Sequence, residues 1–322
     1  RLIGYTSLLL TAVILVISFG IILRNPISGV DETMYHASRV AHAIQEKTLF
    51  FSRTHNERQV SFPFGSELWL LWPMLLTRQE AVARVVFWVA FPLALTGLWL
   101  VIRRLGAPRH AAALGVCAWA ATPLIFRNSL VQKPELWLVF CTLGAAWAFL
   151  PESSGEGEGC RRHTRRFLAC GAWIGLAASI RIPALLLIPA AMIGCLVQLR
   201  PGWRSVSRGL VMLFAGLLAT LIISGFAGLL LRNRAERGGL FGTPQLTALM
   251  TARKPFSGFP VHLGRFQLDL LDFPVAPGGG EWFTAHVQSV ARLAGISARL
   301  PGEGGGWPGE YAPYVPNRAM RL

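Results

Sequence analysis

Long, uninterrupted apolar runs are the feature of this chain that most restricts how it can fold. The first run extends from residue 2 to residue 23 without a charged side chain, and several more follow it. A membrane-spanning α-helix needs about 20 apolar residues, whereas strands of a membrane β-barrel alternate apolar and polar residues over roughly ten positions. The continuous runs therefore predict an all-α integral membrane protein.

The composition agrees with this prediction and limits the classes of partner. Hydrophobic residues make up 53% of the chain and charged residues only 15%, which is too apolar for a soluble domain of 322 residues. The net charge of +15 could indicate a nucleic-acid-binding protein, but the basic residues form short clusters between apolar runs instead of one stripe. We therefore expect no nucleic-acid partner.

The basic clusters also predict the topology. The apolar run 167–199 is long enough for one tilted helix or for two short helices that turn near Arg181. Only a turn at Arg181 puts the clusters 103–109, 161–166 and 200–208 on the same side of the membrane, as the positive-inside rule favours. This topology has about seven spans, at residues 2–23, 81–102, 111–126, 134–150, 167–180, 183–199 and 209–231.

The same topology divides the chain into two predicted regions. Residues 1–231 are expected to form a polytopic domain of the plasma (bacterial inner) membrane, with the N-terminus in the cytoplasm and an outer loop at residues 25–80. Residues 232–322 are expected to be an extracytoplasmic segment, because their glycine and proline clusters favour irregular loops. Since the sequence begins with Arg1 instead of Met and ends at Leu322 in a predicted loop, we expect a fragment at both ends that stops before further spans.

The outer loop opens with residues 31–47, whose apolar residues recur at helical spacing. Asp31 and Glu32 stand at the start, where helix capping and the helix dipole explain acidic residues without a catalytic role. The favoured interpretation of Arg39 is a solvated helix face, with a salt bridge to Asp31 on the same helix or a phosphate contact as alternatives. Residues 62–73 are expected to be a second surface segment, since tryptophan is favoured at the membrane interface. The apolar positions that predict an amphipathic surface helix are Met34, Ala37, Val40, Ala41 and Ile44.

Three charged residues near the ends of later apolar runs could either stabilise the fold or belong to a functional site. Glu135 follows Pro134 at a predicted helix start, where it can interact with the helix dipole, and Lys133 can be an ordinary interfacial lysine. Arg181 is the only charged residue in the run 167–199, and such a charge is costly unless it is paired or reaches water. The residues alone leave both interpretations open.

Three short motifs are similar to those of a known enzyme class. They are GVDETMYH after the first run, VQKPELW at the start of the fourth run, and GLAASIRIP at the expected turn. Together they resemble the GT-C class of membrane glycosyltransferases, in particular the bacterial relatives of the dolichyl-phosphate-mannose protein mannosyltransferases. The resemblance covers roughly residues 2–231.

The resemblance implies a reaction and two carboxylates that support it. In this class the donor is a sugar on a polyprenyl phosphate, and the aspartate after the first span is the candidate catalytic base. That aspartate corresponds to Asp31 in the loop 25–80. Glu135 matches the acidic residue at the start of the fourth span, which could orient the acceptor or hold a divalent cation. The implied reaction is inverting transfer of the sugar to a hydroxyl of a lipid, glycan or protein acceptor on the outer face.

The resemblance also implies residues that bind substrate. Arg181 matches a basic residue, often lysine, that neutralises the lipid phosphate, and arginine can bind phosphate oxygens bidentately. Lys133 is a second candidate for a phosphate contact. Glu32 and Arg39 are the remaining candidates for substrate binding, because both lie on the segment that carries the implied base.

Two other classes of protein stay open at this stage. A membrane transporter or lipid flippase is the main alternative, although the polar residues gather at the outer ends of the spans and transport sites favour the bilayer midplane. A non-catalytic scaffold in envelope assembly would leave Asp31 and Glu135 dispensable. No motif indicates a cofactor, and no histidine spacing indicates a metal site, so a divalent metal stays an open question.

Overall fold

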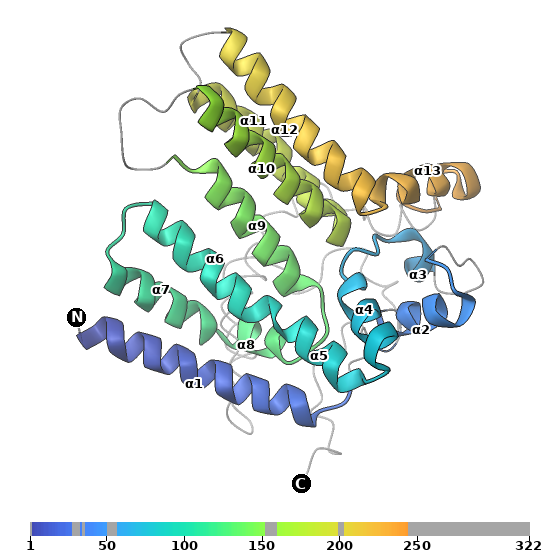
Figure 1. Ribbon diagram of the computed structural model, residues 1–322, viewed down its shortest axis with the longest axis horizontal. Helices are drawn as coiled ribbons and strands as arrows, with labels where there is room; N and C mark the ends of the chain where they lie inside the picture. Colours follow the sequence, from blue (N-terminus) through green and yellow to red (C-terminus); the bar gives the residue numbers. More distant parts are fainter. Residues whose placement is uncertain are drawn as a thin grey trace, which may run out of the picture. The chain divides into compact units, whose positions relative to one another are not determined.

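The computed structural model describes residues 2–27, 33, 36–49, 57–151, 160–198 and 203–243. Every regular element in these residues is a helix (Figure 1), which confirms the predicted all-α class. Within them, three helical stretches are long and apolar enough to cross a membrane: α1 (Leu2–Arg24), α5 with α6 (Glu80–Arg104), and Val206–Ile223 of α12. The chain is therefore a membrane protein with transmembrane helices, while the total of seven spans stays a prediction.

The predicted span at residues 111–126 is wrong, because the structure divides it into two helices. These are α7 (Arg109–Ala120) and α8 (Pro123–Ser129). Thr122 has an extended backbone, with φ −62° and ψ 124°, because a residue that precedes proline is disfavoured in the helical conformation. The proline therefore ends one helix and begins the next.

The predicted span at residues 209–231 is also two helices. The first is α12 (Trp203–Ile223) and the second is α13 (Phe226–Arg237). Between them Gly225 has a φ of 74°, in the left-handed region that glycine adopts at little cost. As a result, α13 continues across the predicted boundary between residues 231 and 232.

The expected break at Arg181 is present. Helix α10 (Cys160–Ile180) ends directly before it, and Arg181 has an extended backbone with φ −144° and ψ 123°. A 3₁₀ turn at Ile182–Leu186 contains Pro183 and leads into α11 (Leu187–Gln198), because proline in a helix interior would remove a hydrogen bond and clash with the preceding turn. The apolar run therefore forms two segments, and Arg181 stands at their junction.

The helices pack in an order that places the ends of α9 and α10 side by side. Going across the bundle in Figure 1, α12 packs against α10, α10 against α9 (Glu135–Phe149), α9 against α6 (Ala90–Arg104), and α6 against α7. Helix α1 packs against α7 and α5. Because α9 and α10 are neighbours of opposite direction, the first residue of α9 meets the last residues of α10.

Glycine residues allow the closest of these contacts, between α10 and α12. A Cβ atom at Gly171 or Gly175 of α10 would collide with main-chain atoms of α12, and one at Gly216 of α12 would collide with the Leu168 carbonyl of α10. Two glycines four residues apart are a frequent basis of close helix packing in membranes. The backbones of α10 and α12 are therefore in direct contact.

One end of the bundle, here called the basic end, joins helices through arginine. Arg104 at the end of α6 donates to the Pro151 carbonyl at 3.4 Å, and its guanidinium lies 4.9 Å from the centre of the Trp147 ring. Arg166 near the start of α10 donates to the carbonyls of Ala148 and Phe149 at the end of α9. These contacts satisfy carbonyl oxygens that have no partner within the helix.

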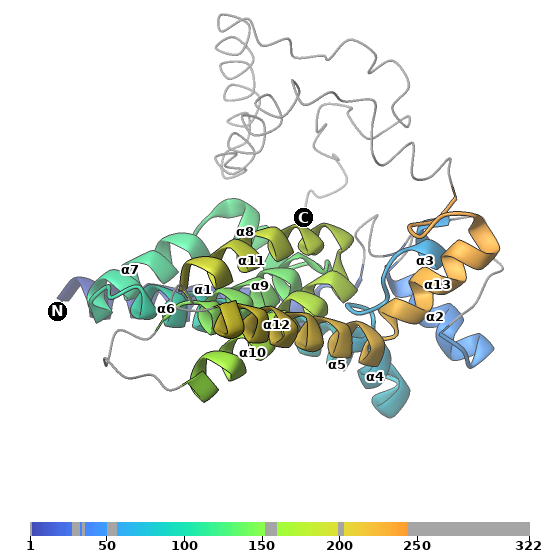
Figure 2. The ribbon, with the colours of Figure 1, turned by 90° about the horizontal axis from the view of Figure 1, so that it is seen from above.

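The opposite end, here called the site end, gathers the outer-loop helices. Figures 1 and 2 show α2 (Ala37–Glu46), α3 (Glu57–Ser61) and α13 close together at this end. The Asn233 side chain of α13 donates to the Ser61 carbonyl of α3 at 2.9 Å, and Arg232 donates to the Val60 carbonyl. Segments that are 172 residues apart in sequence are therefore joined by hydrogen bonds.

Candidate functional site

An ion pair between Glu135 and Arg181 lies at the site end. Glu135 is the first residue of α9 and Arg181 directly follows α10, so the packing of these two helices brings together residues 46 positions apart. Arg181 Nη2 lies 2.7 Å from Glu135 Oε1, and the two side chains are 34% and 36% exposed. Two residues that the sequence motifs singled out separately are thus direct partners.

The pair leaves hydrogen-bonding capacity on both residues. Among the described residues, the second carboxylate oxygen of Glu135 has no hydrogen-bond partner, and Glu135 is the only side chain that is hydrogen-bonded to Arg181. An arginine carries five N–H donors in a planar fork and can bind one anion while it contacts another. An ion pair that is about one-third exposed contributes only about 0–1 kcal/mol to stability, so this contact adds little to the stability of the fold.

A second ion pair, fully buried, was not predicted from the sequence. Glu67, directly before α4 (Leu68–Thr77), is only 1% exposed. Its Oε1 accepts hydrogen bonds from Arg39 at 2.7 Å and from His36 at 2.9 Å, and its Oε2 accepts one from Ser66 at 2.7 Å. We call these four residues the Glu67 cluster.

The Glu67 cluster keeps its carboxylate ionised. Burial alone would raise the pKa of Glu67, but the Arg39 guanidinium and the hydrogen bonds from His36 and Ser66 lower it to about 2. The guanidinium also donates to the main-chain carbonyls of Pro63 and Phe62 at 2.9 and 2.8 Å. The charge is therefore paired and hydrogen-bonded, as a buried charge must be to be tolerated.

The expectation of a solvated face for Arg39 is wrong. The residue is 2% exposed and its guanidinium lies 4.7 Å from the centre of the Phe64 ring. The helical spacing of apolar residues placed Arg39 away from the core because it counted only apolar side chains. Arg39 does form a salt bridge, but with Glu67, which the sequence did not indicate; the alternative of a salt bridge with Asp31 lies outside the described residues.

The loop that carries the Glu67 cluster is docked on the end of α10. The Gly65 N–H donates to the Ser179 carbonyl at 3.0 Å. A Cβ atom at Gly65 would lie 2.5 Å from that carbonyl oxygen, so only glycine allows this approach. Ser179 is two residues before Arg181, and the Glu67 cluster is thus joined to the Glu135–Arg181 pair through the main chain.

Two stacked tryptophans connect α4 with α9, and each follows an ion-pair carboxylate by two positions in sequence. Trp69 of α4 stacks on Trp137 of α9 with ring centres 4.2 Å apart and an angle of 4° between the planes. Trp137 is buried, whereas Trp69 is 44% exposed. This contact fixes α4 against the first turn of α9, which begins with Glu135.

The start of the outer loop is anchored by two residues of α5 (Glu80–Trp88). Glu80 Oε1 accepts a hydrogen bond from the Ile27 N–H at 2.9 Å. Arg84 donates to the carbonyls of Ile22 and Asn25 at the end of α1. The arginine thereby satisfies carbonyl oxygens at the end of a helix, and it fixes the direction in which the chain leaves the membrane.

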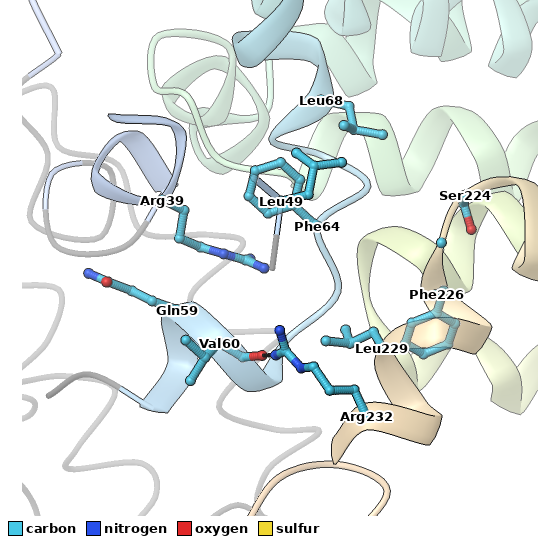
Figure 3. A pocket seen from close by; sticks show the side chains of 11 residues that line it. Arg39, Leu49, Gln59, Val60, Phe64, Leu68, Ser224, Phe226, Leu229 and Arg232 are labelled. Carbon is cyan, nitrogen blue, oxygen red and sulfur yellow. Dashed lines mark hydrogen bonds between the residues drawn. The ribbon is translucent and has the colours of Figure 1, made fainter. Parts of the chain in front are cut away.

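A small pocket lies between the Glu67 cluster and the junction of α12 and α13 (Figure 3). Arg39 and Phe64 line one side, and Phe226, Leu229 and Arg232 line the other. Its volume of about 50 Å³ is well below the roughly 300–1,000 Å³ of typical small-molecule sites. This pocket is therefore too small to be the binding site for a sugar.

The structure does not test the predicted substrate-binding or catalytic roles of Asp31, Glu32 and Lys133. Asp31 and Glu32 are outside the residues that the structure describes. Lys133 is half-buried, two residues before Glu135, and its contact with a phosphate stays a prediction. In the described part of the chain, no group of three or more histidine, cysteine or carboxylate side chains is arranged to hold a metal ion.

The fold and the two ion pairs define an all-helical membrane protein with a charged site at one end of its helices. The sequence model of the dolichyl-phosphate-mannose-protein mannosyltransferase family matches residues 66–227, half of the chain. The chain therefore belongs to this family of membrane glycosyltransferases, as its motifs indicated. The matched region includes Glu67, Glu135 and Arg181. No curated protein and no solved structure gives a significant match.

Proposed function

We propose that this protein transfers a sugar from a polyprenyl-phosphate-linked donor to a hydroxyl of a lipid, glycan or protein acceptor on the outer face of the membrane. Family membership supports sugar transfer. The observation that carries the proposal further is the Glu135–Arg181 ion pair, because it places a carboxylate and a guanidinium with unused donors at one end of the helices.

In the proposed reaction, the acceptor hydroxyl attacks the anomeric carbon from the side opposite to the phosphate. The bond between the anomeric carbon and the phosphate oxygen breaks, a bond to the acceptor oxygen forms, and the configuration is inverted. Asp31 takes the proton of the hydroxyl as general base. The polyprenyl phosphate leaves with the electron pair and gains negative charge.

Arg181 is proposed to stabilise the leaving phosphate. Fixed hydrogen-bond donors that face a developing charge are a direct route to rate enhancement. The contact with Glu135 Oε1 at 2.7 Å uses one nitrogen of the guanidinium and sets its orientation. Glu135 then has an oxygen left to orient the acceptor or to hold a divalent cation, while Lys133 and Glu32 are proposed to contact the substrates.

The site end is proposed to face the outside of a bacterial inner membrane. The basic end carries Arg103, Arg104, Arg109 and Arg166, and clusters of arginine favour the cytoplasmic side. Single cysteines at Ser154 and Ser205 in a cysteine-free background should resist an impermeant thiol reagent applied from outside, whereas a cysteine at Ser257 should react. Reaction at Ser205 from outside would contradict this orientation.

The direct test is to incubate the purified protein with labelled polyprenyl-phosphate sugars and candidate acceptors, with and without a chelator of divalent cations. We expect one donor to be consumed and the label to appear on an acceptor. Glu135→Gln should slow this transfer, and Glu46→Gln at an exposed position of α2 is the matched control. If no donor is consumed but a substrate moves across vesicles that contain the protein, a transporter would replace the enzyme as the best interpretation.

A further inference from the structure

The Glu67 cluster holds three segments of the outer region together. Arg39 lies in α2, His36 directly precedes it, and Glu67 stands at the start of α4. The Arg39 guanidinium also binds the carbonyls of Phe62 and Pro63. One buried carboxylate therefore fixes α2 to the loop that precedes α4.

Stability alone does not account for a buried charge of this kind. Apolar residues of similar volume often replace a buried ion pair at no loss of stability, because both charges lose their hydration. An ion pair with several hydrogen bonds allows only one relative arrangement of the segments that carry it, whereas apolar contacts allow several. The Glu67 cluster is therefore suited to fix a geometry.

The fixed geometry extends from the Glu67 cluster to the Glu135–Arg181 pair. Gly65, two residues before Glu67, is hydrogen-bonded to Ser179, two residues before Arg181. The stacked rings of Trp69 and Trp137 form a second connection, from α4 to the first turn of α9. A displacement of the Glu67 cluster would therefore reach both members of the ion pair.

The cluster also holds one end of the segment that carries the proposed base. Ile27 is fixed by Glu80 on one side of this segment, and His36 is fixed by Glu67 on the other. Asp31 lies in the sequence between these two anchors. Both anchors are carboxylates from the part of the chain that returns to the membrane.

We propose that Glu67 is a positioning residue for the sugar transfer: through Arg39 and His36 it fixes α2 relative to the Glu135–Arg181 pair. The proposal rests on the proposed function. Glu67 itself takes no part in proton transfer, because its oxygens are used by Arg39, His36 and Ser66.

The first experiment compares Glu67→Gln with Glu46→Gln in the full-length protein in lipid nanodiscs. We expect Glu67→Gln to lower kcat by about a hundredfold, the effect of a misplacement of roughly 1 Å, while the Kd for the labelled donor changes by less than about threefold. Glu46→Gln should retain the wild-type kcat. A normal kcat in folded Glu67→Gln protein would overturn the proposal.

A second variant separates positioning from simple stabilisation. In Glu67→Leu with Arg39→Met, apolar side chains replace the buried pair, so no buried charge is left unpaired and thermal stability should be higher than in Glu67→Leu alone. The positioning role predicts that transfer by this double variant stays slow. Recovery of both stability and kcat would overturn the proposal, because it would show that the ion pair only stabilises the fold.

A distance measurement makes the proposal testable even if no donor is found. Spin labels at Gln45 of α2 and at Leu186 after α10, both exposed, should give a narrow distance distribution in the wild-type background. Glu67→Gln should broaden this distribution, whereas Glu46→Gln should not. An unchanged distribution would contradict the positioning role, while absence of transfer by the wild type would contradict only the proposed function.

Discussion

Arginines donate to main-chain carbonyls at both ends of the helix bundle, as Arg84 and Arg232 do at the site end, but in the described part of the chain the two ends differ in their contacts with carboxylates. At the basic end, Arg104 and Arg166 donate to main-chain carbonyls where helices finish. At the site end, Arg39 and Arg181 contact the carboxylates of Glu67 and Glu135. A contact with a carbonyl leaves a positive charge at the membrane surface, whereas a contact with a carboxylate cancels the charge locally and fixes a position.

This difference explains why the number of arginines does not identify the site. The chain has 31 lysine and arginine residues against 16 acidic residues, so nearly half of the cations have no acidic side chain available to them. Positive charge near the cytoplasmic surface is attracted to anionic lipid and helps to set the orientation of the protein in the membrane. Acidic residues are fewer than basic residues in this chain. Their positions therefore indicate the candidate site more directly than the positions of the arginines do.

The largest expected effect tests whether the site end carries out the chemistry. Asp31→Asn should reduce transfer by a factor of about a hundred to ten thousand, the usual loss when a general base is removed. Asparagine caps a helix about as well as aspartate, so a capping role would leave turnover nearly unchanged. The measurement is kcat with the labelled donor, with donor binding as the control. Normal turnover would reject the base and favour a transporter.

The next effect concerns the acid sensitivity of the Glu67 cluster. The pKa of Glu67 is lowered from 4.5 to about 2, so its ion pair contributes stability that is present above about pH 4.5 and is lost as the pH falls towards 2. Thermal unfolding between pH 7 and pH 3 should show a loss in the wild type and a smaller loss in Glu67→Gln. Equal losses in both proteins would show that Glu67 is not the group responsible.

A smaller effect is expected for the phosphate contact of Arg181. Arg181→Ala should weaken donor binding by about 2 kcal/mol, roughly thirtyfold, because hydrogen bonds to a charged group are lost. Arg181→Lys should retain part of the affinity, since the charge remains and the planar fork does not. Unchanged binding to the alanine variant, with normal membrane insertion, would leave the ion pair with Glu135 as a structural contact only.

The docking of the outer loop can be tested at Gly65. Gly65→Ala places a Cβ atom against the Ser179 carbonyl, and the loop must move because main-chain atoms cannot give way easily. We expect a loss of about 1–3 kcal/mol in stability. Gly20→Ala, where a Cβ atom meets nothing within 4 Å, is the matched control. Equal stability of the two variants would contradict the close contact.

The smallest effect is expected at the basic end. Arg166→Gln removes hydrogen bonds to two carbonyls and should cost about 1 kcal/mol of stability, with transfer activity changed by less than about twofold. A large loss of kcat in folded Arg166→Gln protein would show that both ends take part in the reaction. The comparison between the ends would then no longer hold.

The charge pattern of the sequence was sufficient for part of this architecture. The break at Arg181 was predicted because only a turn there puts the three basic clusters on one side of the membrane, and the structure has the break at that residue. The breaks before Pro123 and at Gly225 were missed, because the apolar character continues through both positions while the backbone does not.

The partners of the charged residues could not be predicted. Glu67 contacts residues 28 and 31 positions away, and Glu135 contacts one 46 positions away, so no local spacing connects them. The motifs named Glu135 and Arg181 but gave no reason to place them in contact. One signal for Glu67 was available: a single acidic residue at the start of an apolar helix needs a cation when that helix start is buried.

The direct contact between the backbones of α10 and α12 has a consequence for the depth of Arg181 in a bilayer. Glycine at Gly171, Gly175 and Gly216 lets the two helices meet in one register. A change of register by a full turn would move the end of α10 by about 5.4 Å along the membrane normal. A phosphate group on a lipid has a fixed height at the interface. The glycines therefore set the height of Arg181 in the bilayer, on which its proposed contact with the phosphate depends.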